Sequence, residues 1–111
     1  MLNKANRLTK HGSFNYVYNK GERFSMPQIS LSLARGKKNV RVGFVVSNKL
    51  GKAVRRNLVK RRMRAAIQEL LPGISGGQLV FVAKNGICQL DYPQIKAQME
   101  ELLVRGKLIK P

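Results

Sequence analysis

The chain has 111 residues and a mass of 12.5 kDa, which suits one domain and leaves no room for two independent cores. Its hydrophobic fraction of 43% is enough for a packed core and too high for a disordered tail. Lys and Arg number 22 against 5 Asp and Glu, which gives a formal net charge of +17. A charge this large in so small a chain favours a polyanionic partner, and nucleic acid is the first candidate.

Membrane and secreted proteins do not fit this sequence. No apolar run approaches the roughly 20 residues that a transmembrane helix needs, so we expect no membrane partner. The residues after Met1 lack the apolar stretch of a secretory signal. The single cysteine, Cys88, can form neither an internal disulfide nor a thiolate cluster, and we interpret it as a small packing residue. A reducing cytoplasm is the expected location.

Catalytic side chains are scarce. No Asp or Glu occurs from Arg23 to Gln68, and the five acids elsewhere are scattered. General acid–base hydrolysis usually needs two carboxylates, or a histidine beside a nucleophile, and magnesium needs clustered oxygen ligands. The one histidine, His11, has no partners for a zinc site and is interpreted as a solvated residue or a phosphate contact. We therefore expect no catalytic residue, no metal ligand and no cofactor held by protein side chains alone.

The first expected element is a short helix over Thr9–Lys20. Phe14, Val17 and Tyr18 follow the i, i+3, i+4 spacing of one helix face, and Gly21 would end the helix. Three strands are expected after it. Residues 28–34 alternate between an apolar face and a small polar face that includes Ser32.

A hairpin-like turn at residues 36–39 would lead into a second long strand over Val40–Ser47. The continuous apolar run Leu79–Ala83 suits a buried strand. Between these two strands, Lys52–Leu71 is the strongest helix prediction, ended by Pro72 and Gly73.

The last helix would begin at the cap residue Asp91, followed by Pro93, and end at Gly106. The expected order is therefore α-β-β-α-β-α. Two strands that flank a helix suggest a βαβ unit inside an otherwise antiparallel sheet, so we predict a single α+β domain over residues 1–111 with a small mixed sheet.

The helix over residues 52–71 segregates its side chains. At 100° per residue one side is apolar, and it comprises Val59, Met63, Ala66, Ile67 and Leu70. The far side and its edges hold polar and basic residues, namely Arg56, Asn57, Lys60, Arg61, Arg64 and Gln68, and the preceding loop and first turn add Lys49, Lys52 and Arg55. An ordinary solvated helix would mix charges of both signs, whereas this one has no acid before Glu69. The pattern, with the positive end of the helix dipole, favours phosphate contact.

Asn57 stands among these cations. Its amide offers a donor and an acceptor that suit a base edge or a 2′-hydroxyl of RNA. A local cap or a link to a neighbouring loop is the alternative role.

The sequence from Lys49 to Arg64 resembles the arginine-rich "RNR" motif of the bacterial ribonuclease P protein subunit; it reads KLGKAVRRNLVKRRMR. The strand before it, Arg41–Ser47, and the aromatic first helix also resemble that family in the same order. The resemblance implies a ribonucleoprotein that removes the 5′ leader from precursor tRNA, with the hydrolysis performed by the RNA subunit and its magnesium. It also implies one protein per RNA, a ribosomal-protein-S5-domain-2-like sheet and a left-handed βαβ crossover, where general rules favour a right-handed one.

The resemblance also assigns roles to residues. It implies that Lys49, Lys52, Arg55, Arg56, Asn57, Lys60, Arg61 and Arg64 bind the RNA subunit. It implies a leader-binding cleft with Phe14 and Tyr18, on which bases would stack, and with Arg7, Lys10 and Ser32.

Two positions depart from the family pattern. Leu58 stands where the motif usually has a basic residue, so either a phosphate contact is lost or Arg55 or Arg62 takes its place. Ser32 stands near the place of a tyrosine in some members, so a hydroxyl contact replaces stacking there.

Two other functions fit the composition. One is a structural RNA-binding protein of the small ribosomal type, which composition does not separate from a nuclease subunit. The other is a DNA-binding regulator, but a strand precedes the basic helix where a helix-turn-helix would need its positioning helix.

Overall fold

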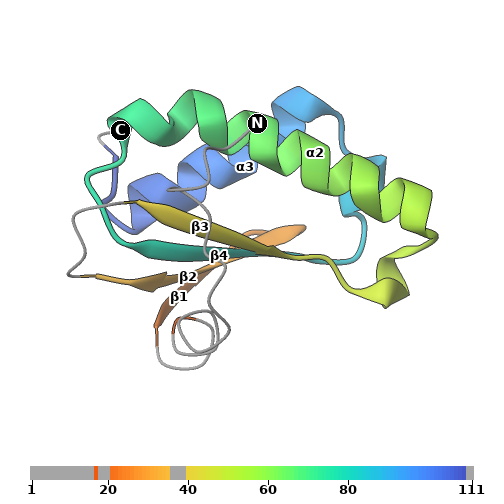
Figure 1. Cartoon of the computed structure of the whole chain (residues 1–111), viewed down its shortest axis with the longest axis horizontal. Helices are drawn as coiled ribbons and strands as arrows, with labels where there is room; N and C mark the ends of the chain where they lie inside the picture. Colours follow the sequence, from red (N-terminus) through yellow and green to blue (C-terminus); the bar gives the residue numbers. More distant parts are fainter. Residues whose placement is uncertain (1–16, 18–20, 36–39, 110–111) are drawn as a thin grey trace.

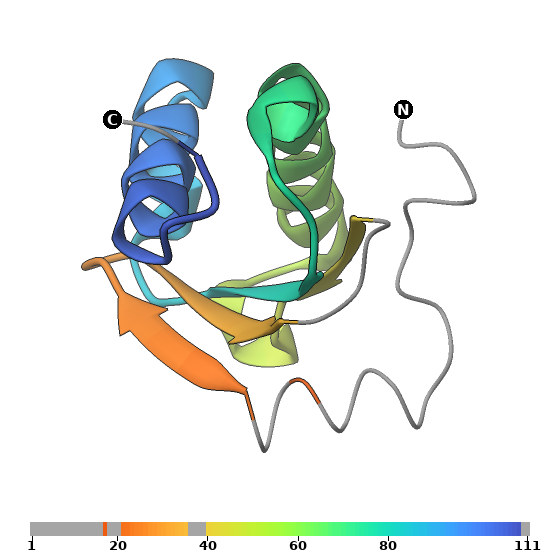
Figure 2. The ribbon, with the colours of Figure 1, turned by 90° about the vertical axis from the view of Figure 1, so that its left-hand side faces the viewer.

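The computed structural model describes residues 17, 21–35 and 40–109. Within these ranges four strands form one sheet in the order β1-β2-β4-β3, and two helices lie side by side on one of its faces (Figure 1). Figure 2 shows the two helices nearly end-on above the sheet. This architecture confirms the predicted α+β class. The elements are β1 (Glu22–Ser25), β2 (Ile29–Ala34), β3 (Arg41–Val45), α2 (Ala53–Leu70), β4 (Gln78–Ala83) and α3 (Tyr92–Arg105).

Strand β4 is an interior strand of the sheet. It pairs parallel with β3 and antiparallel with β2, so that Phe81 lies between Phe44 and Leu31. Because α2 connects the parallel strands β3 and β4, the predicted βαβ unit is confirmed. The left hand of its crossover and the likeness to the ribosomal protein domain stay predictions.

The sheet corrects two expectations. Strand β1 was not predicted, because it is only four residues long and Phe24 is its one core-facing apolar residue. The hairpin expected between residues 28–34 and 40–47 is wrong in its pairing: β2 bonds to β1 and β4, and β4 separates it from β3. The position between β2 and β3 pairs both edges of the apolar β4, and the two apolar clusters cover its two faces.

The predictions of the second and third helices agree closely with the structure, whereas the first predicted helix lies outside the described residues except for Val17. Lys52 is the N-cap of α2, and η3, a short 3-10 helix over Leu71–Gly73, follows its end. Asp91 caps α3 as expected, because its side chain accepts from the backbone of Gln94, whose side chain accepts from the backbone N–H of Asp91 in return.

Apolar side chains gather on both faces of the sheet. The main core lies between the sheet and the two helices and includes the fully buried Leu31, Met63, Phe81 and Leu102. A smaller cluster on the other face joins Val80 to Val17, the one residue of the predicted first helix that the structure describes, which is helical. We call this other side the second sheet face; its residues are Arg23, Ser25, Ser30, Ser32, Ala34, Arg41, Gly43, Val45, Gln78, Val80 and Val82.

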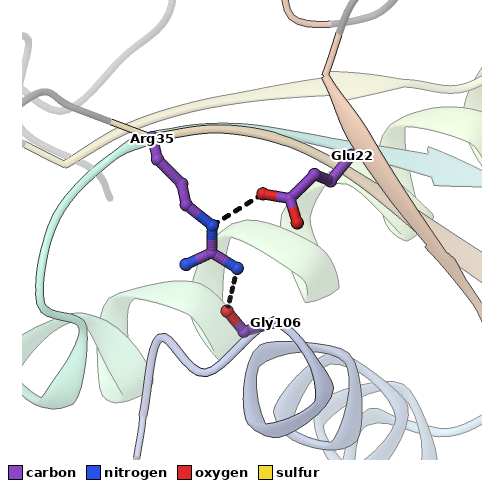
Figure 3. Close-up of polar contacts among 3 residues, drawn as sticks. All are labelled: Glu22, Arg35 and Gly106. Carbon is purple, nitrogen blue, oxygen red and sulfur yellow. Dashed lines mark hydrogen bonds and ion pairs between the residues drawn. The ribbon is translucent and has the colours of Figure 1, made fainter.

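Arg35 holds the short strand β1 against the end of α3. Its Nε donates to the Glu22 carboxylate at 2.6 Å, and its Nη2 donates to the Gly106 carbonyl at 2.7 Å (Figure 3). The carbonyls at a helix end have no partner inside the helix and carry partial negative charge, so a guanidinium suits this place.

Gly21 should be intolerant of any side chain. A Cβ there would lie 2.6 Å from the Val17 carbonyl oxygen and 2.7 Å from that of Leu33, both of them backbone atoms. We expect Gly21→Ala to destabilise the fold by about 1–3 kcal/mol, measured as a lower Tm in thermal unfolding. Gly73→Ala is the control, because its Cβ would meet only Ile109 Cγ2 at 3.6 Å. Equal Tm values for the two variants would contradict this close approach.

Candidate nucleic-acid interface

The acidic side chains form their ion pairs away from the start of α2. Glu22 pairs with Arg35, Glu101 pairs with Arg105 within α3, and Glu69, near the end of α2, pairs with Lys96. Within residues 21–35 and 40–109, the cations of α2 from Arg55 to Arg64 therefore have no carboxylate partner.

The faces of α2 agree with the predicted segregation. Val59, Met63, Ala66 and Ile67 are buried, and Leu70 is half-buried against the core. The eight residues predicted to bind the RNA subunit all retain solvent exposure: Lys49, Lys52, Arg55, Asn57 and Arg61 are exposed, and Arg56, Lys60 and Arg64 are half-buried. The structure thus brings these eight onto α2 and the loop before it, as predicted.

The N-terminus of α2 is suited to an anion. Lys52, its N-cap, makes no side-chain cap hydrogen bond, and the first turn holds no acidic residue. The helix dipole and N–H groups without a side-chain cap add positive potential to the side-chain charges already there.

Arg56 has a role that the sequence pattern did not indicate. Its Nη1 donates to Asn48 Oδ1 at 2.8 Å, and its Nε donates to the Gly51 carbonyl at 3.2 Å. The guanidinium therefore braces the loop that presents Lys49 and Lys52. Only its remaining N–H groups are left for phosphate.

Arg62 points toward α3. Its Nη1 donates to the Leu90 carbonyl at 2.9 Å, in the turn before α3. This contact turns Arg62 toward α3, so Arg55, which is exposed, is the better placed of the two to replace the basic residue missing at Leu58. The 100° spacing already left Arg62 off the predicted basic side, but no sequence signal identified the Leu90 carbonyl as its partner.

Glu69 links the two helices. Its carboxylate accepts from Lys96 Nζ at 2.6 Å and from Tyr92 Oη at 2.7 Å, both on α3. The hydrogen bond from Lys96, followed by that from Tyr92, holds the pKa of Glu69 below its ordinary value. The link fixes α2 against α3 and so helps to orient the basic face.

The second sheet face presents small side chains in register. Ser32 and Val80 lie in one row with Gly43, and Ser30 and Val82 lie in the next. Ser32 is only 3% exposed, whereas Ser30 and Val82 are half-buried. Ser30 and Val82 were not among the predicted candidates, because the resemblance that implied Ser32 does not point to them, although the alternation of residues 28–34 places Ser30 on the same face as Ser32. The predicted leader residues Arg7, Lys10, Phe14 and Tyr18 lie outside the described residues.

Little in the described part suggests protein-based metal chemistry. Within residues 17, 21–35 and 40–109 no group of three or more His, Cys, Asp and Glu gathers to hold a metal ion. Cys88 is half-buried, packs against the main core and donates its S–H to the Leu50 carbonyl at 3.4 Å, which confirms its packing role. Among the described helices, none has both the length and the apolarity to cross a membrane.

Comparison with known proteins points to one family. The family described as Ribonuclease P matches residues 2–107 of the chain. The ribonuclease P protein component of Chloroflexus aggregans is 34% identical over 111 residues, which cover 97% of this chain and 82% of the relative. That of Nitratiruptor sp. is 38% identical over 94 residues, or 85% of each chain. The RNase P protein of Staphylococcus aureus has a solved structure that matches with a TM-score of 0.87 and 28% identity, covering 96% of this chain and 100% of that one.

The link through Glu69 should make stability depend on pH. A carboxylate whose pKa is lower in the folded state stabilises the fold above its unfolded pKa of about 4.3, and this stabilisation is lost as the pH falls through the folded pKa. We expect Glu69→Gln to lower the Tm at pH 7, and the difference from the wild type to shrink as the pH falls below about 4.3 and to disappear below the folded pKa. Glu101→Gln removes a single ion pair within one helix, whereas Glu69 accepts two hydrogen bonds from the other helix, so Glu101→Gln should change the Tm less. A pH-independent difference for Glu69→Gln would rule out the carboxylate as its source.

Proposed function

Because this chain belongs to the Ribonuclease P protein family, we propose that it is the protein component of an endoribonuclease ribonucleoprotein that removes the 5′ leader of precursor tRNA. One copy binds one ribonuclease P RNA through the basic face of α2. The second sheet face and the N-terminal segment bind the leader. The complex acts in the cytoplasm.

The observation that supports RNA binding most directly is the unpaired charge of α2. Seven Lys and Arg occur from Lys52 to Arg64, and none has a carboxylate partner in the part of the chain that the structure describes. Such a face repels itself until an anion neutralises it, and RNA phosphates do so while releasing their own counterions. The orientation of the face depends on Met63 and Ile67 being buried on the opposite side.

The division of chemistry follows from what the protein offers. The basic face of α2 presents cations and an amide but no carboxylate or histidine that could act as a general base. The hydrolysis is therefore assigned to the RNA, with magnesium bound through the RNA, and the protein contributes binding and positioning. No protein residue is assigned as a metal ligand.

The leader is proposed to pass over the second sheet face. Ser30 offers a small hydroxyl side chain and Val82 an apolar surface, and both are half-buried, whereas Ser32 and Gly43 in the neighbouring row are buried. Phe14 and Tyr18, from the predicted first helix, provide rings on which bases stack, at about 1–3 kcal/mol per base.

The phosphate contacts of α2 are measurable as a salt dependence. We expect Arg61→Ala and Arg64→Ala each to weaken binding to ribonuclease P RNA and to reduce the slope of log K against log salt by roughly 0.7–0.9, because each removes one phosphate contact. Lys107→Gln is the matched control, since it removes one exposed cation two residues after α3 ends at Arg105. The end of α3 lies at the opposite end of the helical layer from the start of α2 (Figure 1). A slope unchanged in both Arg variants would mean that these side chains do not touch phosphate.

Reconstitution tests the function as a whole. The protein, added to a bacterial ribonuclease P RNA at low magnesium, should restore cleavage of the 5′ leader. Phe14→Ala with Tyr18→Ala should weaken binding of precursor tRNA and leave that of mature tRNA nearly unchanged, because only the precursor has a leader. Tyr16→Ala, which the sequence pattern puts off the Phe14–Tyr18 face, is the control for loss of an aromatic ring. Equal losses for precursor and mature tRNA would instead favour a structural RNA-binding protein.

A further inference from the structure

Two large apolar side chains remain exposed on α2. Val54 is 78% exposed and Leu58 is 38% exposed, and they are the large exposed hydrophobic residues of the described part of the chain. They stand four positions apart, so they lie on one face of the helix, one turn from each other. Ala65, two turns further on, is exposed on the same side. We call Val54 and Leu58 the apolar pair.

The apolar pair belongs neither to the core nor to the contact with α3. The core side of α2 carries Val59 and Met63, and α3 is reached from a flank by Arg62 and Glu69. Single exposed hydrophobic residues are ordinary on protein surfaces. The position of this pair is what requires an explanation, because it lies in the first two turns of α2, inside the basic face.

Cationic and polar side chains flank the apolar pair on both sides. Arg55 is exposed on one side, and Asn57 and Arg61 are exposed on the other. A partner that covers the pair must therefore meet positive charge along both of its margins. A second copy of this chain, with a formal charge of +17, meets that face with like charge.

A shallow groove of paired RNA has the complementary pattern. Its two phosphate tracks run along the margins, and riboses and base edges form the surface between them. An anionic lipid surface is a weaker match, because interfacial helices bury a broad apolar face, and this one has two large residues.

We propose that Val54 and Leu58 pack against the riboses and base edges of a shallow groove in the ribonuclease P RNA, while the flanking cations bind the phosphates of the two strands. The inference rests on the proposed function and adds to it the type of RNA surface that the start of α2 contacts. Leu58 then exchanges the phosphate contact of a basic residue for an apolar one, so binding at this position is insensitive to salt.

The test compares affinity with salt dependence. Val54→Ala with Leu58→Ala should bind ribonuclease P RNA about tenfold more weakly with an unchanged slope of log K against log salt, because the lost contact is apolar and releases no counterion. Leu58→Arg should steepen the slope by roughly 0.7–0.9. Both side chains are exposed, and Ala and Arg are good helix formers, so the variants should keep the wild-type Tm. Val104→Ala, a truncation on α3, is the control and should leave RNA affinity unchanged.

Four results would overturn the inference. The first is that the double variant binds ribonuclease P RNA with the affinity of the wild type. The second is that the slope of log K against log salt is reduced in the double variant, which would mean that the substitutions displace the neighbouring cations. The third is binding of the wild type, but not the double variant, to phosphatidylserine vesicles without a change in RNA affinity, which would identify a lipid surface. The fourth is a dimer of the wild type that the double variant loses in sedimentation velocity, which would identify a second copy. Failure of the wild type itself to bind ribonuclease P RNA would instead overturn the proposed function.

Discussion

Burial of strand β4 on all sides is the constraint on which the rest of the structure depends. Its residues Val80 and Phe81 are both fully buried although they point to opposite faces of the sheet. Packing is therefore needed on both faces: α2 and α3 cover Phe81, and Val17 packs against Val80. The same constraint makes β4 an interior strand parallel to β3, so the chain must cross over the sheet, and α2 is that crossover.

The crossover also separates the charges. One side of α2 is buried on the sheet and one flank is tied to α3 by Glu69 and Arg62, so within the described residues the basic side is the one left for a partner. The ion pairs of Glu22 and Glu101 lie on β1, the end of β2 and α3, where they stabilise the fold without neutralising the basic face. Six of the 22 Lys and Arg lie on α2 against one acid, and RNA phosphates can neutralise this local charge.

The basic face is not uniform in what its residues do. Arg56 divides its donors between the loop and solvent, Arg62 is held at the Leu90 carbonyl, and Arg61 extends freely. The basic residues of this motif are therefore not interchangeable: Arg56 stabilises the preceding loop, Arg62 contacts the turn before α3, and Arg61 is exposed. The apolar pair of Val54 and Leu58 adds a fourth type of contact, one that does not depend on phosphate.

The sequence by itself determined the α+β class, the extent of α2, the cap at Asp91 and the side of α2 that is basic. These features are local. The hydrophobic period of a helix or strand, a capping residue and the lack of acids in a helix can each be recognised within a short stretch of sequence. Only the tertiary structure decided that β4 lies between β2 and β3, that Glu22–Ser25 forms a fourth strand, and which partners Arg35, Arg56 and Arg62 bind. Those outcomes depend on which apolar faces and unpaired carbonyls meet after the chain has folded, and no local pattern records the distance between residues such as Arg35 and Gly106.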